Sequence, residues 1–213
     1  MADPIFSDSL RTYLDNLVPP RPAELVRMET YAQEHAFPII GPASGYCCYV
    51  LARLAGARRV FELGSGYGYS TAWFARAVID NGGGEVHHVV WDQELSDRAR
   101  KHLAALELDS VVRYHVSEAV ETLRGTPGQW DVIFMDIDKK GYPGAVPLIA
   151  ERLRKGGILI VDNMLWSGRV YDPTERSEDT EAIRRATEQL TRSGDWASTL
   201  VPIRDGLLVS YRR

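Results

Sequence analysis

The sequence predicts an α/β fold, a mostly parallel sheet with helices on both faces, and three observations support this. Five β-rich apolar runs alternate with helical patterns between residues 59 and 193, which is typical of a parallel sheet covered on both sides. A glycine-rich turn, residues 64–68, joins the first run to a helical pattern. Two later runs end in Asp136 and Asp162. The last two observations put candidate chemistry at the carboxyl ends of the strands.

The chain before the sheet predicts helices. Residues 7–36 show two amphipathic patterns separated by Pro19, Pro20 and Pro22, and a third helix is expected from about Ser44 to Ala55. Strands are then expected at about 59–63, 86–91, 111–115, 131–135 and 157–161. The intervening and following helices are expected near 69–80, 95–107, 117–124, 142–153 and 179–193.

The end of the chain predicts a hairpin. Residues 199–203 and 207–211 are β-rich and flank Asp205-Gly206, a strong turn signal. We expect this antiparallel pair to close one edge of the sheet. The length of 213 residues favours one domain, 1–213, with N-terminal helices over 1–56 and a cofactor-binding and catalytic core over 57–213.

Composition favours small-molecule partners. A net charge of −4 gives no global electrostatic reason to bind nucleic acid, although Arg184, Arg185 and Arg192 form a local basic strip. The adjacent Cys47 and Cys48 are poorly placed for an ordinary disulfide. No apolar run approaches the roughly 20 residues of a membrane span, and no leader pattern opens the sequence. We therefore expect a cytoplasmic protein with no membrane association.

The glycine turn predicts a cofactor loop. Gly64, Gly66 and Gly68 permit close backbone approach, while Ser70 and Thr71 begin a helix whose free N–H groups face the turn. The G-x-G-x-G spacing, led by Glu62, differs from the dinucleotide fingerprint G-x-G-x-x-G. A nicotinamide-dependent oxidoreductase is therefore disfavoured.

The acid-bearing strand ends predict a metal and a base. Asp136, Asp162 and Asn163 offer only oxygen ligands, which suit Mg²⁺, and also Mn²⁺ or Ca²⁺, better than zinc. Lys139 lies beside them in the sequence. The scattered histidines suggest neither a ligand cluster nor a triad.

Four motifs in order give the chain a resemblance to a known family. They occupy residues 61–70, 131–139, 156–168 and 202–207. With them the sequence resembles, over nearly its whole length, the class I S-adenosylmethionine-dependent methyltransferases, specifically the metal-dependent O-methyltransferases related to catechol and caffeoyl-CoA O-methyltransferases. The resemblance implies a Rossmann-like, seven-stranded sheet and, as in bacterial members, a homodimer.

The resemblance also implies the site. Glu62, Gly64 and Ser70 would contact the methionine part of the cofactor, and the segment from Ser117 to Glu118 would border the adenine. The expected cofactor-binding residues are Glu62, Gly64, Ser65, Gly66, Ser70, Asp92, Ser117, Glu118 and Asp136. The family usually has an acid for the ribose hydroxyls at the end of the second strand, where this chain has Val90; Asp92 would substitute if the loop shifts.

The implied reaction transfers a methyl group to a hydroxyl of a small catechol-like or hydroxyphenylpropanoid acceptor. A phenol has a pKa of about 10, so few acceptor molecules are ionised near neutral pH. Asp136, Asp162 and Asn163 are the implied metal ligands, and the metal would stabilise the ionised oxygen. Lys139 is the implied base, which makes Lys139 and Asp136 the expected catalytic residues.

Other interpretations stay open. Some bacterial relatives methylate a hydroxylated uridine in tRNA, and the arginine strip allows this. Val90 at the ribose position allows a cofactor-binding or interaction protein with little catalysis. Asp138 either orients Lys139 or binds only backbone, and Trp166 either borders the substrate or packs at an interface.

Overall fold

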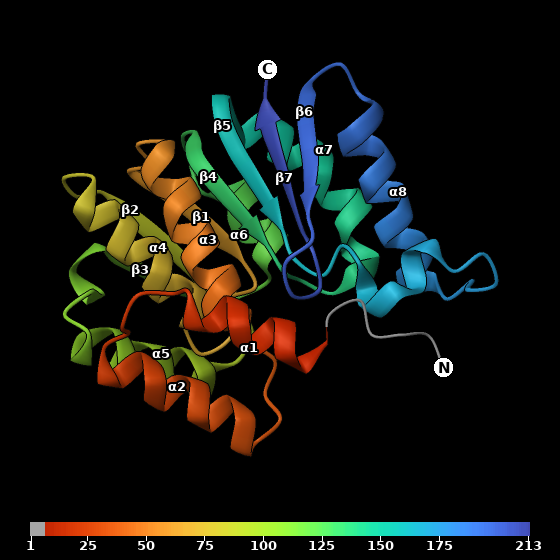
Figure 1. Cartoon of the computed structure of the whole chain (residues 1–213). Helices are drawn as coiled ribbons and strands as arrows, with labels where there is room; N and C mark the ends of the chain where they lie inside the picture. The colour runs from red at the N-terminus through yellow and green to blue at the C-terminus, as the bar shows by residue number, and fades with distance from the viewer. Residues whose placement is uncertain (1–6) are drawn as a thin grey trace.

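The computed structural model describes residues 7–213 and shows an α/β architecture (Figure 1). Its helices are α1 (Asp8–Asn16), α2 (Ala23–Glu34), α3 (Gly41–Leu54), α4 (Tyr69–Asp80), α5 (Gln93–Ala105), α6 (Ala119–Gly125), α7 (Tyr142–Arg152) and α8 (Glu178–Arg192). The strands are β1 (Arg59–Leu63), β2 (Glu85–Val90), β3 (Val112–Val116), β4 (Trp130–Met135), β5 (Leu153–Val161), β6 (Trp196–Val201) and β7 (Leu207–Arg212). Short 3-10 turns η1 (Asp109–Val111), η2 (Lys139–Gly141) and η3 (Trp166–Tyr171) complete the set.

One seven-stranded sheet runs through the molecule in the order β3-β2-β1-β4-β5-β7-β6. The first five strands in this order pair in parallel, whereas β7 pairs antiparallel with both β5 and β6. The expected fold class, including the antiparallel strand pair at one edge, is therefore confirmed. The strand order reverses between β1 and β4, which is where open α/β sheets bind ligands.

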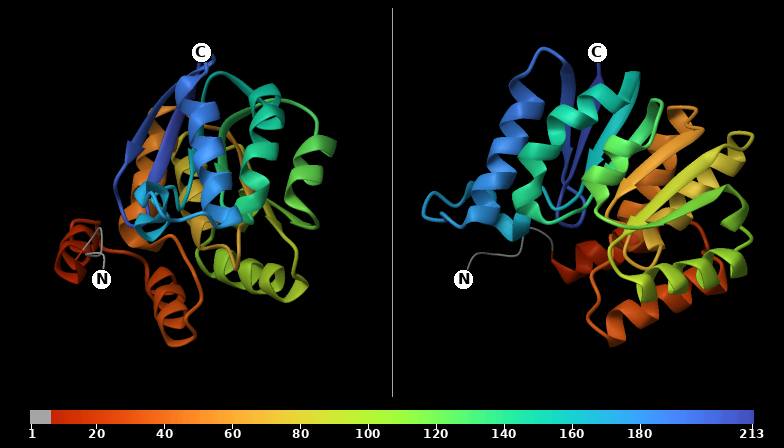
Figure 2. Two further views of the ribbon diagram at one scale, coloured as in Figure 1. Left: turned by 90° about the vertical axis from the view of Figure 1, so that its right-hand side faces the viewer. Right: turned by 180° about the vertical axis from the view of Figure 1, so that it is seen from behind.

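The two faces of the sheet carry separate cores, because neighbouring residues of a strand point to opposite sides. Val60, Val132 and Ile160 face a cluster that includes side chains of α3 and α4. Their neighbours Phe61, Ile133 and Val161 face a cluster with side chains of α6, α7 and α8. Figure 2 shows the sheet edge-on between these helix layers. Because both faces are covered, the central strands β1 and β4 and the second half of β5 are mostly apolar.

Most expected boundaries agree with the structure within three residues. Helix α3 begins at Gly41 rather than near Ser44, because Pro42 occupies the first turn, where a missing N–H costs nothing. Strand β6 begins at Trp196 rather than residue 199, and the Trp196 side chain is buried. Strand β5 begins at Leu153, four residues earlier than expected, because Gly156 and Gly157 stay within the strand.

Helices α1 and α2 lie beyond the carboxyl ends of the parallel strands, at the bottom of the view in Figure 1. Helix α1 has no buried residue, whereas α2 buries Leu25, Met28 and Ala32. Within residues 7–213, no helix is long and apolar enough to span a bilayer. The N-terminal helices therefore add a layer over the end of the sheet that carries the candidate site.

Candidate active site

Backbone hydrogen bonds hold the strand ends together beneath the site. The amide of Asp136 donates to the carbonyl of Leu63 at 2.8 Å, and that of Asp162 donates to the carbonyl of Met135 at 3.1 Å. Strands β1, β4 and β5 are neighbours in register, so the residues that follow them lie side by side. The two acids, 26 positions apart by their residue numbers, are brought together in this way.

The glycine turn fits closely against the end of β4. Gly64 has φ +88, and a Cβ there would lie 2.2 Å from the carbonyl oxygen of Asp136, so only glycine is compatible with both the dihedral and the space. The turn ends at Gly68, which makes no side-chain capping hydrogen bond at the start of α4. The first N–H groups of this helix therefore face the site without a side-chain partner.

A cavity of about 180 Å³ lies over the glycine turn. Five residues of the expected cofactor site line it together: Gly64, Ser65, Gly66, Ser70 and Asp136. Phe37, Pro38, Ile39 and Ile40, which connect α2 to α3, form the opposite wall. This geometry suits a ligand with an apolar portion and a polar end held by the turn.

Glu62 is fully buried at the end of β1 beside this cavity. The hydroxyl of Thr71 donates to its Oε2 at 2.5 Å, and Nδ1 of His88 lies 3.0 Å from the same hydroxyl. Burial raises the pKa of Glu62 to about 7, although the hydroxyls of Ser70, Thr71 and Ser65 oppose the rise. Oε1 has no hydrogen-bond partner within residues 7–213. A positively charged ligand group near Glu62 would therefore satisfy it.

Three expected cofactor residues lie elsewhere, at the ends of β2 and β3. Asp92 caps α5 by accepting from the amide of Leu95. Glu118 caps α6, and the hydroxyl of Ser117 lies 2.6 Å from that of Thr122. None of the three lines the 180 Å³ cavity. Their expected contacts with ribose and adenine stay predictions, and Val90 ends β2 as a nearly buried apolar side chain.

The carboxylates of the expected metal site have contrasting surroundings. The Asp162 side chain is only 2% exposed, and its Oδ1 has no hydrogen-bond partner in the described part of the chain. Burial, followed by repulsion from Asp136, raises the pKa of Asp162 above its usual range, and Arg204 opposes this rise. The orphaned Oδ1 is suited to a cation ligand.

Asn163 can offer its amide oxygen to the same place. Its Nδ2 donates to Oδ2 of Asp205 at 3.3 Å, so the nitrogen is engaged and the amide oxygen is left as the possible ligand. The residue adopts φ 61, a conformation that asparagine tolerates better than most residues. The donor set of Asp136, Asp162 and Asn163 therefore fits a hard divalent cation. No group of three or more His, Cys, Asp or Glu suited to a metal occurs anywhere in residues 7–213.

Lys139 is held among the acids. Its Nζ donates to Oδ1 of Asp136 at 2.6 Å and to the hydroxyl of Tyr142 at 2.8 Å. That hydroxyl donates in turn to the backbone carbonyl of Asp162 at 3.0 Å. The side chain of Asp138 accepts from the amide of Lys140 at 3.4 Å and makes no hydrogen bond to the Nζ atom of Lys139. The backbone role left open for Asp138 is the one observed.

Sequence reasoning missed Tyr142 and Arg204. Tyr142 is fully buried and connects Lys139 to β5; its position three residues after Lys139, at a helix start, was the available signal. Arg204 precedes the Asp205-Gly206 turn and reaches Asp162, with Nη1 3.2 Å from Oδ2. No local pattern links these two residues, which are 42 positions apart.

A larger cavity of about 370 Å³ adjoins the site. Its lining comes from α1, the start of α3, and the loop between β6 and β7, and it comprises Arg11, Leu14, Asp15, Ile40, Gly41, Ala43, Ser44, Ser167, Ile203, Arg204 and Asp205. Ile40 also lines the smaller cavity. The hydroxyl of Ser44 is buried and lacks a hydrogen-bond partner within residues 7–213. The two cavities share Ile40, with Asp136 lining the smaller one and Arg204 the larger one, whereas Lys139 and Asp162 line neither.

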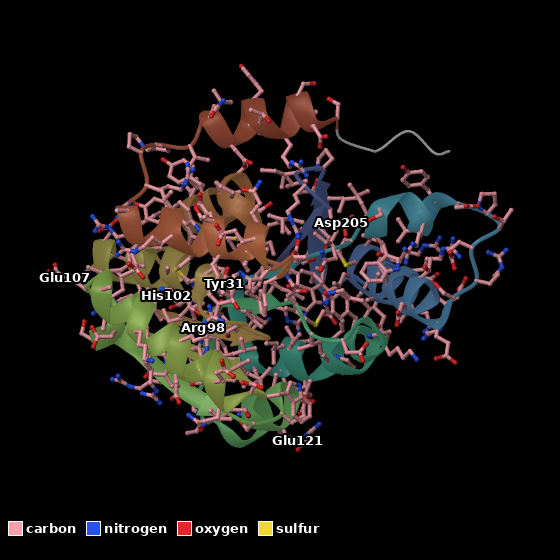
Figure 3. All side chains as sticks on the ribbon, turned by 90° about the horizontal axis from the view of Figure 1, so that it is seen from below. Tyr31, Arg98, His102, Glu107, Glu121 and Asp205 are labelled. Carbon is pink, nitrogen blue, oxygen red and sulfur yellow. The ribbon has the colours of Figure 1, made fainter. Side chains whose placement is uncertain are left out.

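Side-chain contacts hold helix α2 against α5 at this end of the molecule. Tyr31 of α2 and Arg98 and His102 of α5 lie near one another in the view from below (Figure 3). The guanidinium of Arg98 stacks on the Tyr31 ring at 3.7 Å, and Nδ1 of His102 lies 2.6 Å from Oε1 of Glu24. The hydroxyl of Tyr67, in the glycine turn, donates to the carbonyl of Met28. These contacts tie α2 to both α5 and the turn.

The arginine strip on α8 is largely engaged within the chain. Arg184 donates to the carbonyls of Val170, Arg169, Asp172 and Glu175, and it pairs with Glu181. Arg192 pairs with Glu188. Arg184 therefore holds the loop that follows η3, and its charge is only partly available to a polyanion.

Comparison with known proteins agrees with this geometry. The model of the O-methyltransferase family matches residues 20–213. Catechol O-methyltransferase domain-containing protein 1 of Mus musculus is 29% identical over 167 residues, which cover 76% of this chain and 63% of the mouse protein. Catechol O-methyltransferase of Niastella koreensis is 28% identical, over 86% of this chain and 85% of that protein. The chain spans a little under two thirds of the mouse relative.

A solved structure gives the same picture. TomG of Streptomyces achromogenes, an O-methyltransferase involved in tomaymycin synthesis and solved in complex with S-adenosylmethionine, aligns with a TM-score of 0.85 at 26% identity over 96% of each chain. The fold is that of the Rossmann-like methyltransferases. The chain belongs to the O-methyltransferase family.

Proposed function

We propose that this protein transfers a methyl group from S-adenosylmethionine to a hydroxyl oxygen of a small catechol-like or hydroxyphenylpropanoid acceptor. The reaction would depend on a divalent cation, with Mg²⁺ as the preferred ion. The observation that carries the proposal is the linked set of charged groups beside two cavities. Lys139 pairs with Asp136, which lines the smaller cavity, and Arg204, which lines the larger cavity, pairs with the buried Asp162. Such an arrangement lets a donor and an acceptor meet next to charged groups.

The cofactor assignment is supported by the smaller cavity and by the relatives. The TomG structure contains S-adenosylmethionine, and the 180 Å³ cavity is lined by the corresponding glycine turn. The buried carboxyl of Glu62 suits the amino group of the methionine part. We further propose that Asp92, Ser117 and Glu118 border the ribose and adenine portion, since they lie at the ends of β2 and β3.

The cation assignment is supported by the donor chemistry. Asp136, Asp162 and the amide oxygen of Asn163 would hold the ion, and the orphaned Oδ1 of Asp162 is the oxygen most in need of a partner. When bound, a divalent cation stabilises the ionised form of an acceptor hydroxyl, and S-adenosylmethionine supplies the methyl group.

Side chains of the protein would accept the proton, position the base and exclude water. In its neutral amine form, Lys139 would accept the proton of the acceptor hydroxyl at Nζ. Its contacts with Asp136 and Tyr142 hold this atom in a fixed position. The hydroxyl of Tyr142 also donates to the backbone carbonyl of Asp162, so Tyr142 fixes Lys139 relative to the end of β5. The cavity residues Leu14, Ile40 and Ile203 exclude water and accept the apolar part of the acceptor. Trp166, whose ring centroid lies 5.8 Å from Nζ of Lys139, adds an aromatic wall.

The structure offers less support for the two alternatives. A tRNA acceptor would need the α8 arginines, but Arg184 and Arg192 bind groups of this chain. A protein without catalysis gives no reason to assemble Lys139 beside two acids. A homodimer stays a prediction, which sedimentation of the purified chain would test.

The activity test uses labelled S-adenosylmethionine, Mg²⁺ and a panel of catechols and hydroxyphenylpropanoids. We expect labelled product with at least one vicinal diol and loss of transfer when the metal is chelated. Transfer that continues in excess chelator would remove the cation from the proposal. No transfer to any acceptor, with no heat of binding for the cofactor in calorimetry, would favour an interaction protein.

A further inference from the structure

Arg204 makes the closest cationic contact to the buried carboxylate of Asp162. Its Nη1 lies 3.2 Å from Oδ2, the Asp162 side chain is 2% exposed, and that of Arg204 is 32% exposed. Arg204 arrives from the loop between β6 and β7, whereas Asp162 follows β5. Because a buried carboxylate is strongly stabilised by a neighbouring guanidinium, this pairing matters to the charge state of the site.

Both carboxylates of the cation site already have a basic partner in the chain. Asp136 is paired with Lys139 at 2.6 Å, and Asp162 is paired with Arg204. Asp205, which accepts from the side-chain amide of Asn163, adds a third acidic side chain beside these two pairs. A divalent cation held by both carboxylates would add two further positive charges in a largely buried place, so it would repel both basic side chains.

Of the two basic side chains, Arg204 has room to leave. Lys139 is 11% exposed and also bonds Tyr142 and the carbonyl of Ile137. Within residues 7–213, the side chain of Arg204 makes no hydrogen bond other than the one to Asp162. Arg204 also lines the 370 Å³ cavity. Its guanidinium can therefore swing into that space without breaking a second contact.

The backbone at Arg204 points to a retained role for its side chain. Arg204 has φ 50, in the left-handed region, where a residue with a Cβ is strained by roughly 1 kcal/mol relative to glycine. It sits in a tight turn in which the amide of Gly206 donates to the carbonyl of Ile203. The ion pair with Asp162 is a contact that can offset this backbone strain.

We propose that Arg204 competes with the divalent cation for Asp162 and so weakens the affinity of the site for metal. The inference rests on the cation site of the proposed function. The arginine-paired state engages Oδ2 of Asp162, and a cation on Oδ1 of the same carboxylate would be repelled by the guanidinium. Metal binding therefore favours the state in which Arg204 moves into the larger cavity. The apparent dissociation constant is then the intrinsic constant divided by the fraction of molecules in which Arg204 is unpaired.

The test measures Mn²⁺ binding to the full chain by electron paramagnetic resonance of the free ion. Arg204→Gly removes the guanidinium and suits φ 50, so this variant is expected to fold. We expect its Mn²⁺ dissociation constant to fall by on the order of tenfold or more. Arg204→Lys keeps a charge but loses the planar fork, and an intermediate affinity is expected.

The matched control is Arg176→Gly. This substitution removes the same net charge. Arg176 is exposed in the loop before α8, where it donates to the carbonyl of Glu175 at 2.9 Å and pairs with Glu181 at 3.9 Å. Its Mn²⁺ affinity should stay at the wild-type value. The double variant Arg204→Gly, Asp162→Asn should lose the gained affinity, which would assign the ion to this site.

The outcomes separate the two claims. Equal Mn²⁺ affinity of the wild type and Arg204→Gly, or weaker binding by the variant, overturns the role of Arg204 and leaves the cation site in place. An equal gain in Arg176→Gly would reduce the effect to net charge and overturns it as well. No binding by any variant, with normal thermal unfolding, overturns both the competition and the cation requirement.

Discussion

The Nζ atom of Lys139 lies 2.6 Å from Oδ1 of Asp136, so the proposed base and a proposed metal ligand form one ion pair. The pair is set by the short 3-10 turn that follows β4, in which Lys139 begins η2. Because the Lys139 side chain is 11% exposed, a neutral replacement leaves Asp136 less compensated. The site thus couples proton transfer to metal binding through a single contact.

Replacing Lys139 by alanine should slow methyl transfer by roughly 10²- to 10⁴-fold, the usual contribution of a general base. Single-turnover transfer to the best catechol acceptor measures this step. Lys140→Ala is the matched control, because Lys140 is exposed and pairs with Glu178 on the surface. Equal rates for Lys139→Ala and the wild type would remove Lys139 from the reaction.

Removing one metal ligand should act on cation binding before cofactor binding. Asp162→Asn keeps the size of the side chain but removes its charge, and we expect Mn²⁺ affinity to fall by at least about 10²-fold. Binding of S-adenosylhomocysteine should change little, since Asp162 does not line the smaller cavity. Calorimetric titration of the variant with Mn²⁺ and with S-adenosylhomocysteine measures both affinities. An equal loss of affinity for the two ligands would contradict separate cation and cofactor sites.

Glu62 predicts a pH dependence of stability in the cofactor-free protein. Its folded pKa of about 7 exceeds the usual 4.5, so the stability it adds is fully present below pH 4.5 and is lost as the pH rises through 7. Between pH 5 and 7.5 the loss should be on the order of 2 kcal/mol. Thermal unfolding of the wild type and Glu62→Gln over this range measures the difference.

The comparison with Glu62→Gln isolates this group from the histidines. Burial lowers the pKa of His88 to about 3 and that of His87 to about 4, so their contributions are present above pH 6.5 and are lost as the pH falls. His88 is linked to Glu62 through Thr71. Above pH 5, however, both imidazoles are neutral in the folded chain, so their contributions depend on pH in the same way in the two proteins and cancel in the difference. A difference that does not vary with pH would show that the pKa of Glu62 is the same in the folded and unfolded chain, which contradicts the raised value.

Two glycine substitutions should have opposite effects. Gly64→Ala places a Cβ 2.2 Å from the carbonyl oxygen of Asp136 at φ +88, and we expect a loss of more than about 2 kcal/mol of unfolding free energy. Gly144→Ala lies in α7 with nothing within 4 Å of the added Cβ, and a gain of about 0.5–1 kcal/mol is expected. Chemical denaturation measures both, and a stable Gly64→Ala would contradict the close approach.

The strand and helix pattern was predictable because it depends on local sequence. Strand β1 and helix α4 have the expected bounds, since an apolar run, a glycine turn and a helical pattern adjoin there. Strand β5 was predicted too short at its start, because glycines at 156 and 157 signal a turn while the pairing of Leu153 with Trp130 extends the ladder. Tertiary pairing decided that boundary.

The candidate site was predictable only where its members follow strands. Asp136 and Asp162 end neighbouring strands, so their approach follows from the order of the sheet. Arg204 reaches Asp162 from a loop on an antiparallel strand pair, and nothing local in the sequence indicates the direction of that side chain. The buried chain from Glu62 through Thr71 to His88 likewise depends on how α4 packs over β2.

The central claim is that Asp136, Asp162 and Asn163 share one divalent cation next to the cofactor. A crystal grown with S-adenosylhomocysteine and Mn²⁺ tests it through the anomalous signal of manganese. We predict one peak bonded to an oxygen of each of these three side chains, with Arg204 turned away from Asp162. A map with cofactor product in the smaller cavity, no anomalous peak at the three residues and the Arg204 pairing intact would contradict the account.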